Sequence, residues 1–161
     1  MGAERYAFRP MSAADLVLMH RWFAAPHVAQ WWHDPEAFEF VSSDLDHPDM
    51  AQFIVASEDR PFAYLQCYRM SAWHDGFGQQ PKGTRGLDQF IGEADMIGHG
   101  HGAGFIRSFT ERLLAAGTPR VVVDPNPQNP RAIRTYEKAG FVRDRLVDTP
   151  DGVALLMVRD A

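Results

Sequence analysis

The sequence predicts a single mixed α/β domain with antiparallel hairpins towards both ends and a strand–helix–strand unit between them. Three observations support this prediction. Short apolar stretches recur at strand spacing, one longer amphipathic stretch follows a glycine-rich segment, and tight turns separate neighbouring strands. The chain has 161 residues, 45% of them apolar, and contains neither repeats nor a dividing linker. We therefore expect one core and one domain over residues 1–161.

The first elements follow from local signals. Residues 6–10 alternate as a short strand does. Ser12 and Asp15 are spaced as a capping box and open a helix, because apolar residues then recur on one helical face. These residues are Leu16, Met19 and Phe23. Pro26 ends this helix, and a second short helix is expected over 28–32.

The spacing of apolar residues changes from helical to strand periodicity where the first hairpin is expected. Residues 33–50 are rich in Asp, Pro and Ser and predict a loop with at most one helical turn. Strands are expected over 52–57 and 61–70, around a turn at 58–60. A second loop is expected over 75–83, which holds three glycines and a proline.

The second half alternates strands with helices. The predicted strand over 85–92 contains two glycines, which indicate a bulge or a close backbone approach. A helix is expected after the glycine-rich segment 97–104, and Gly117 ends it. The remaining expected elements are a central strand over 121–123, a helix over 131–139, and two last strands over 141–145 and 153–158 around a turn at 149–152.

Glycines at alternate positions precede the longest predicted helix. Gly98, Gly100 and Gly102 allow successive backbone N–H groups to point at one anion, and the helix dipole favours negative charge there. No Gly-Lys-Ser/Thr follows, which excludes a Walker loop, and the dinucleotide fingerprint is also missing. On its own, the segment fits a phosphate site and a plain tight turn equally well.

A second motif resolves this choice. Residues 129–141, Asn-Pro-Arg-Ala-Ile-Arg-Thr-Tyr-Glu-Lys-Ala-Gly-Phe, follow the glycines by about thirty positions, and the two together resemble the acetyl-CoA site of the GNAT N-acetyltransferase superfamily. Trp31-Trp32, residues 85–89 and residues 124–134 narrow the resemblance to the aminoglycoside 6′-N-acetyltransferases. The resemblance implies a mostly antiparallel, twisted sheet flanked by helices and splayed at its central strands. One departure is Ile97, which stands where the superfamily usually has Gln or Arg.

The resemblance also implies which residues bind acetyl-CoA, the acetyl donor. Backbone N–H groups around Phe90 and Ile91 would hold the thioester oxygen. The remaining residues of the donor site would be Ile97, Gly98, His99, Gly100, His101, Gly102, Asn129, Ala132 and Tyr136.

Two catalytic roles are implied in the same way. Asp88 would take the proton of the amine, directly or through water, and would stabilise the positive charge that grows on nitrogen. Tyr136 would protonate the departing CoA thiolate. A solvated strand-edge carboxylate and a packed helical aromatic are the structural alternatives for these two residues.

Aromatic and acidic residues suit a polycationic acceptor, because rings attract ammonium groups and carboxylates pair with them. The expected acceptor site consists of Trp31, Trp32, Tyr64, Gln66, Tyr68 and Asp88. Adjacent tryptophans cannot share one helical core stripe, and Tyr64, Gln66 and Tyr68 share one strand face by period two. His33 and Asp34 are further candidates for substrate contact.

Charge is divided along the chain. Residues 22–59 hold eight acids and no Lys or Arg, whereas residues 60–161 hold thirteen Lys or Arg against eleven acids. This division suits one cationic and one anionic ligand, or else an acidic surface that keeps the protein in solution. With a net charge of −5 and no basic stripe, nucleic acid is not expected as a partner.

Other features exclude further classes. His99 and His101 have no third ligand at metal-site spacing, so no metal is expected. Cys67, the single cysteine, is expected to be a small strand hydrophobe. No run of eighteen apolar residues and no secretory pattern at residues 1–6 occur, so we expect no membrane partner and a cytoplasmic location.

Three functions stay open at this stage. The first is aminoglycoside 6′-N-acetylation. The second is acylation of another amine, such as a hydroxylated lysine in siderophore biosynthesis or a polyamine. The third is a CoA-binding module without catalysis. Exposed strand edges allow either a monomer or a homodimer.

Overall fold

The computed structural model describes residues 5–73 and 76–161. Its seven strands join in one mostly antiparallel sheet in the order β1-β2-β3-β4-β5-β7-β6, with one recorded parallel pair, β4 and β5. The mixed α/β architecture predicted from the sequence is therefore confirmed. The described chain forms two compact units, residues 5–66 with 89–99 and residues 67–88 with 100–161.

The first unit begins with an edge strand and a capped helix. β1 (Tyr6–Pro10) pairs antiparallel with β2 (Met50–Ser57). The Ser12 backbone N–H donates to Asp15 Oδ2 over 2.9 Å, so the predicted capping box exists. A 3₁₀ turn (Ala13–Asp15) precedes α1 (Leu16–Phe23), and α2 (Pro26–Ala29) starts two residues before the helix predicted over 28–32.

The loop predicted over 33–50 is wrong in its central part. α3 (Ala37–Ser43) and a 3₁₀ turn (Asp44–Asp46) occupy it. The cause is the four-residue spacing of Ala37 and Val41, which buries both on one side of α3 and outweighs the flanking Asp and Ser.

The core of this unit lies among these helices and strands. It consists of Met11, Met19, Trp22, Val28, Val41, Ile54, Tyr64 and Phe90. β3 (Arg60–Arg69) and β4 (Arg85–Ile91) each contribute residues to both units. Glu58 and Asp59, the two residues between β2 and β3, both have positive φ, as a tight hairpin turn requires.

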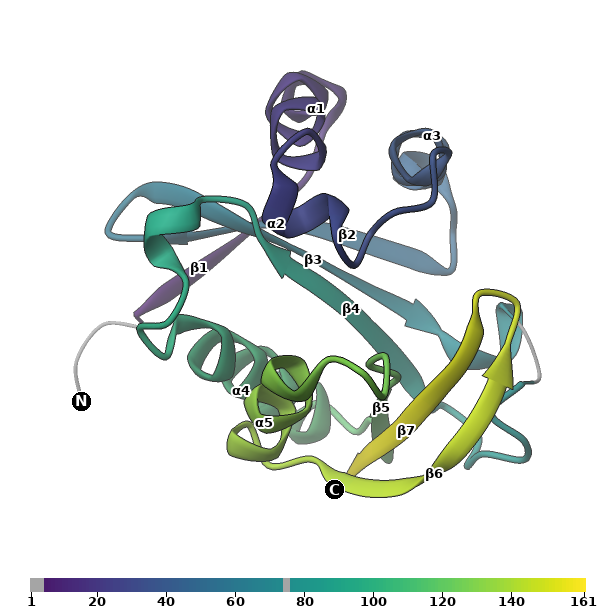
Figure 1. Cartoon of the computed structure of the whole chain (residues 1–161). Coiled ribbons are helices and arrows are strands. Elements are labelled where there is room, and N and C mark those ends of the chain that lie inside the picture. Colours follow the sequence, from purple (N-terminus) through teal and green to yellow (C-terminus); the bar gives the residue numbers. More distant parts are fainter. Residues whose placement is uncertain (1–4, 74–75) are drawn as a thin grey trace. The chain divides into compact units, whose positions relative to one another are not determined.

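The second unit contains the strand–helix–strand region. α4 (His101–Ala115) leads to β5 (Arg120–Val123), and α5 (Pro130–Lys138) leads to β6 (Val142–Thr149) and β7 (Gly152–Asp160). Figure 1 shows α4 beside α5, and α5 leads into the β6–β7 hairpin. Buried aromatic and branched residues fill this unit, including Phe105, Ile106, Val122, Ile133 and Leu156.

Three further expectations can be compared with the structure. Of the loop predicted over 75–83, residue 75 lies outside the described residues, and residues 76–83 form turns and irregular backbone. The described residues contain no helix with both the length and the apolar character needed to cross a membrane. The prediction about a secretory pattern falls largely on residues 1–4, which lie outside the described residues.

Candidate functional site

Two aspartates lie on neighbouring parallel strands, Asp88 in the middle of β4 (Arg85–Ile91) and Asp124 directly after β5 (Arg120–Val123). The β4–β5 ladder pairs Gly86 with Val122, so the same register brings Asp88 opposite Asp124. Both residues are half-buried, and their carboxyl groups lie within hydrogen-bonding reach. Burial, and next the charge of Asp88, raises the pKa of Asp124 well above its ordinary value. The predicted base Asp88 therefore has a second carboxyl group as its neighbour.

Two buried phenols adjoin this carboxyl pair. Tyr68 is 4% exposed and Tyr136 is 6% exposed. Burial raises the pKa of Tyr68 far above its ordinary value, and electrostatic interactions with Asp88, Asp124 and Tyr136 raise it further. A phenol that stays protonated donates a hydrogen bond, so Tyr68 is suited to face acceptor oxygens. The structure thus brings the predicted residues Tyr68, Asp88 and Tyr136 into one electrostatically connected cluster.

Gly86 makes room for this cluster. A Cβ at position 86 would overlap the Tyr68 ring, so the glycine lets that ring lie against the β4 backbone. Gly92, in the first unit, meets the Trp22 indole in the same way. The close backbone approach predicted for this strand from its two glycines is confirmed at both positions.

Cys67 stays outside the chemistry. Burial raises the pKa of its thiol to about 11, although the guanidinium of Arg85 opposes the shift. The thiolate is the reactive form, so at neutral pH this side chain is a small buried hydrophobe, as predicted.

The start of α5 positions Tyr136. Asn129 Oδ1 accepts a hydrogen bond from the Ala132 backbone N–H over 3.2 Å and caps the helix, and Pro130 occupies its first position. The Tyr136 ring packs edge-on against Phe141, with their centroids 5.8 Å apart. Binding of CoA by Asn129 and Ala132 stays a prediction.

The glycine-rich segment has the backbone that an anion site needs. Gly98 and Gly100 adopt φ of +82° and +81°, and residues 98–100 are exposed just before the fifteen-residue α4. A Cβ at either glycine would meet nothing within 4 Å, so conformation and not crowding requires glycine there. Among the described residues, no three His, Cys, Asp or Glu side chains gather as a metal site.

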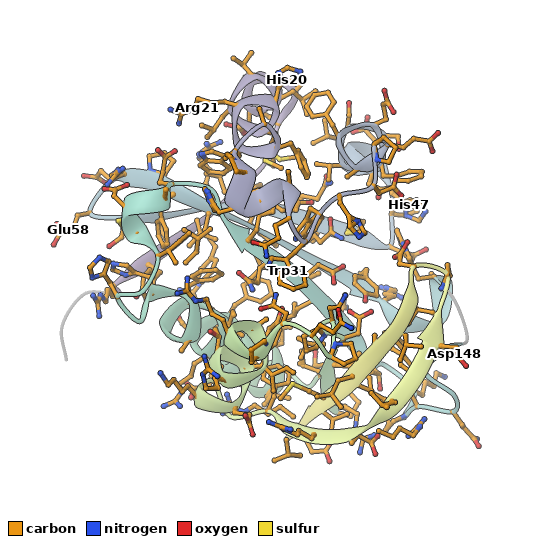
Figure 2. The ribbon with its side chains drawn as sticks, in the orientation of Figure 1. His20, Arg21, Trp31, His47, Glu58 and Asp148 are labelled. Carbon is orange, nitrogen blue, oxygen red and sulfur yellow. The ribbon has the colours of Figure 1, made fainter. Side chains whose placement is uncertain are left out.

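In the first unit, the two tryptophans take opposite roles. Trp32 packs against Phe23, Tyr64 and Phe90, with ring centroids 5.9, 6.2 and 5.3 Å away. Trp31 is 38% exposed, and Figure 2 shows it just beyond α2. The prediction that these neighbours point in different directions is confirmed. Of the two, Trp31 has more surface for a ligand.

Tyr64 is fully buried, and its hydroxyl forms hydrogen bonds with two other side chains of the protein. Its hydroxyl donates to Gln66 Oε1 over 2.6 Å and accepts from Gln52 Nε2 over 3.1 Å. Gln52 Nε2 also donates to the Val41 carbonyl over 2.8 Å. This chain of bonds fixes the half-buried Gln66, so Tyr64 positions Gln66 in the described structure. Substrate contact by either residue stays a prediction.

The backbone around Phe90 and Ile91 is held on both sides. Phe90 is 6% exposed, and His27 Nε2 donates to the Ile91 carbonyl over 2.9 Å. The Gly92 N–H donates to the Phe62 carbonyl over 2.7 Å. The backbone that carries the predicted oxyanion donors is therefore hydrogen-bonded on both sides, and its contact with a thioester stays a prediction. The half-buried Ile97 follows a 3₁₀ turn over Ala94–Met96.

A hollow of about 440 Å³ opens beside Trp32. Its lining residues are Phe23, Ala29, Trp32, His33, Asp34, Pro35, Ala37 and Phe38. Both His33 and Asp34, the further candidates for substrate contact, belong to it.

Sequence reasoning missed two residues. His27 carries no motif that ties it to the distant Ile91. Asp124 did carry a signal, because a carboxylate directly after the apolar run 121–123 ends a central strand, where the ligand sites of parallel sheets gather.

Comparisons with known proteins bear on this arrangement. A family model described as "Acetyltransferase (GNAT) domain" matches residues 12–149. Aminoglycoside N(6′)-acetyltransferase type 1 of Klebsiella pneumoniae is 33% identical over 97% of this chain and 83% of its own. A structure of the aminoglycoside acetyltransferase AAC(6′)-Ib with coenzyme A and kanamycin has a TM-score of 0.87 and 33% identity, covering 96% of this chain and 94% of its own. A spermidine N-acetyltransferase from Vibrio cholerae, 13% identical with a TM-score of 0.74, shares the fold.

Proposed function

This chain belongs to the GNAT acetyltransferase family, and from this premise we propose that it transfers the acetyl group of acetyl-CoA to the 6′-amine of an aminoglycoside. The observation that carries the proposal is the cluster of Asp88, Asp124, Tyr68 and Tyr136, two carboxyl groups with two buried phenols. Acids suit a cationic amine, and a phenol suits a departing thiolate. The two relatives that share 33% identity with this chain are named as aminoglycoside acetyltransferases.

In the proposed reaction, Asp88 first holds the ammonium group of the acceptor. It then takes a proton from nitrogen, directly or through water, which leaves an electron pair to attack the thioester carbon. The new C–N bond forms as the C–S bond breaks. Tyr136 gives a proton to the sulfur, and the acylated nitrogen loses its second proton to solvent, from which Tyr136 regains its own, so free CoA and the neutral N-acetyl product leave.

Other residues hold the two substrates. Backbone N–H groups near Phe90 and Ile91 would stabilise the oxygen that becomes negative during attack. The exposed, positive-φ backbone of residues 98–100 and the start of α4 would bind the pyrophosphate of CoA. Trp31, Gln66 and Tyr68 would orient the acceptor.

A CoA-release assay over a panel of amines tests the substrate. Kanamycin, ribostamycin, spermidine and a hydroxylated lysine are compared at equal concentrations, and the acetylated position is located by NMR. We expect kanamycin and ribostamycin to give the highest kcat/KM, with acetylation at the 6′-amine. A preference for spermidine or the hydroxylated lysine would overturn the aminoglycoside assignment.

Asp88→Asn separates catalysis from mere CoA binding. We expect kcat to fall by about 10²- to 10⁴-fold, the usual range for a lost general base, while calorimetry shows unchanged acetyl-CoA affinity. Asp148→Asn is the matched control, because it removes one exposed carboxylate on β6 (Figure 2). Unchanged turnover in Asp88→Asn would remove this residue from the mechanism.

The sequence predicted a cytoplasmic location and a monomer or homodimer, and both stay predictions.

A further inference from the structure

Asp124 has no assigned part in the proposed reaction, yet its position ties it to Asp88. Continued past Gly86 and Val122, the register of β4 and β5 aligns Asp88, within β4, with Asp124, directly after β5, and their side chains lie within hydrogen-bonding reach. An ionised carboxylate only accepts hydrogen bonds. A hydrogen bond between two carboxyl groups therefore needs a proton on one of them.

The surroundings of Asp124 favour retention of that proton. Asp88 on β4 and Asp151 in the β6–β7 turn both add negative charge near it. Tyr68 on β3 faces the same cluster as a neutral phenol, and Tyr136 on α5 interacts with it electrostatically. The cation Arg85, three residues before Asp88 on β4, is hydrogen-bonded to Cys67.

Two like charges in contact cannot both be ionised cheaply in a partly desolvated site. Burial acts in the same direction, because it penalises the charged form of each carboxyl group. The balance changes when an ammonium group enters, since an adjacent cation favours the ionised form of both.

We propose that Asp88 and Asp124 hold one proton between them in the free protein, and that binding of the cationic acceptor expels this proton to solvent. This inference rests on the proposed function, because it assigns the acceptor to Asp88. The exchange balances in charge: a pair with one negative charge binds one ammonium and becomes a doubly ionised pair, with one proton released. Asp124 is thus a positioning residue that acts through Asp88.

The exchange has a catalytic consequence. Before binding, the shared proton lies on Asp124 and is hydrogen-bonded to the oxygen of Asp88 that would act as a base. After binding, both carboxylates face the ammonium, and Asp88 is free to take the amine proton. The acceptor itself therefore switches on the base, and acetyl-CoA alone leaves it blocked.

Calorimetry of kanamycin binding in buffers of different ionisation enthalpy counts the protons released. Aminoglycoside amines exchange protons on their own account, so the informative quantity is the difference between variants. We expect the wild-type protein to release close to one proton more per kanamycin bound than Asp124→Asn. Asp148→Asn should match the wild-type value.

Infrared spectroscopy of the free protein provides a second readout, independent of binding. The C=O stretch of a protonated carboxyl group should be present in wild-type protein at pH 7 and missing in Asp124→Asn. In the wild-type protein, it should disappear when kanamycin is added. Asp88→Asn supplies a second variant if Asp124→Asn does not fold, and it should also lose the kanamycin-induced change.

Equal proton release by wild-type protein and Asp124→Asn would overturn the proposal. If kanamycin does not bind at all, the aminoglycoside assignment fails, and the infrared signal of the free protein then decides the carboxyl pair alone. If the infrared signal of the protonated carboxyl group is absent from free wild-type protein at pH 7, the two residues do not share a proton. The presence of this signal in wild-type protein and its loss in Asp124→Asn would support the shared proton.

Discussion

The proposed role of Tyr136 as the proton donor requires surroundings that keep its phenol protonated. A phenol must give up its proton to a departing thiolate, so it has to stay protonated until the C–S bond breaks. Tyr136 is 6% exposed, packs on Phe141 and shares a cluster with Tyr68 and Asp88. Burial in general favours the neutral form of a phenol, and the neutral form is the one that can donate a proton.

Tyr136→Phe removes that acid without changing the shape of the ring. We expect kcat to fall about 10²-fold or more, with little change in acetyl-CoA affinity, because protonation of the thiolate occurs only as the bond breaks. Steady-state kinetics and calorimetry measure the two quantities. Tyr6→Phe, the same change at a buried tyrosine on β1, should leave kcat unchanged. If Tyr136→Phe and wild type have equal kcat, a group other than Tyr136 protonates the departing thiolate.

At the scale of elements, the beginning of α4 depends on backbone conformation. Gly100 caps the helix in the left-handed region, with φ of +81° and ψ of 3°. Gly98 has a similar φ, and side chains at either position would have open space. The glycines thus allow a backbone conformation in which exposed N–H groups precede the positive end of the α4 dipole.

Gly100→Ala tests this reading. Alanine at positive φ should lower the free energy of unfolding by about 1–2 kcal/mol and weaken acetyl-CoA binding, because the N–H groups lose their arrangement. Gly100→Asn is the matched comparison, since asparagine tolerates the left-handed region, and it should lose less of both. Denaturant titration and calorimetry measure the effects. If both Gly100→Ala and Gly100→Asn bind acetyl-CoA with wild-type affinity, this backbone does not bind the pyrophosphate of CoA.

At the scale of the whole molecule, the carboxyl pair links stability to pH. The pKa of Asp124 is raised in the folded protein, so between about pH 4 and that raised value the folded chain binds more protons than the unfolded chain. Its contribution to stability is complete below the unfolded pKa and is lost as pH rises through this window. Each pH unit inside the window costs up to about 1.4 kcal/mol.

Asp124→Asn should remove this dependence. Relative to wild type, the free energy of unfolding of the variant should decline less between pH 5 and pH 8. Urea titrations at several pH values give the two curves, and Asp148→Asn should follow the wild-type slope because its carboxylate is exposed. Parallel curves for Asp124→Asn and wild type would show that the pair has no net effect on stability.

Local sequence signals were sufficient wherever one interaction dominates a segment. The capping box at Ser12, the turn at 149–152 and the central strand over 121–123 all follow from near neighbours in the chain. Local sequence signals do not predict α3. Its Asp and Ser residues indicate a loop, but burial of Ala37 and Val41 stabilises a helix that composition alone does not favour.

The sequence by itself determined the alternation of strands and helices, the glycine-rich start of α4 and the family resemblance, because each depends on residue types at short or fixed spacings. Only the tertiary structure decided that Asp124 lies beside Asp88, that Tyr64 is buried behind Gln66, and that His27 holds the Ile91 carbonyl. The first and third of these contacts join residues far apart in the chain, and the burial of Tyr64 depends on residues that pack on it from other elements. Strand register and burial set them, and these quantities exist only once the sheet has formed.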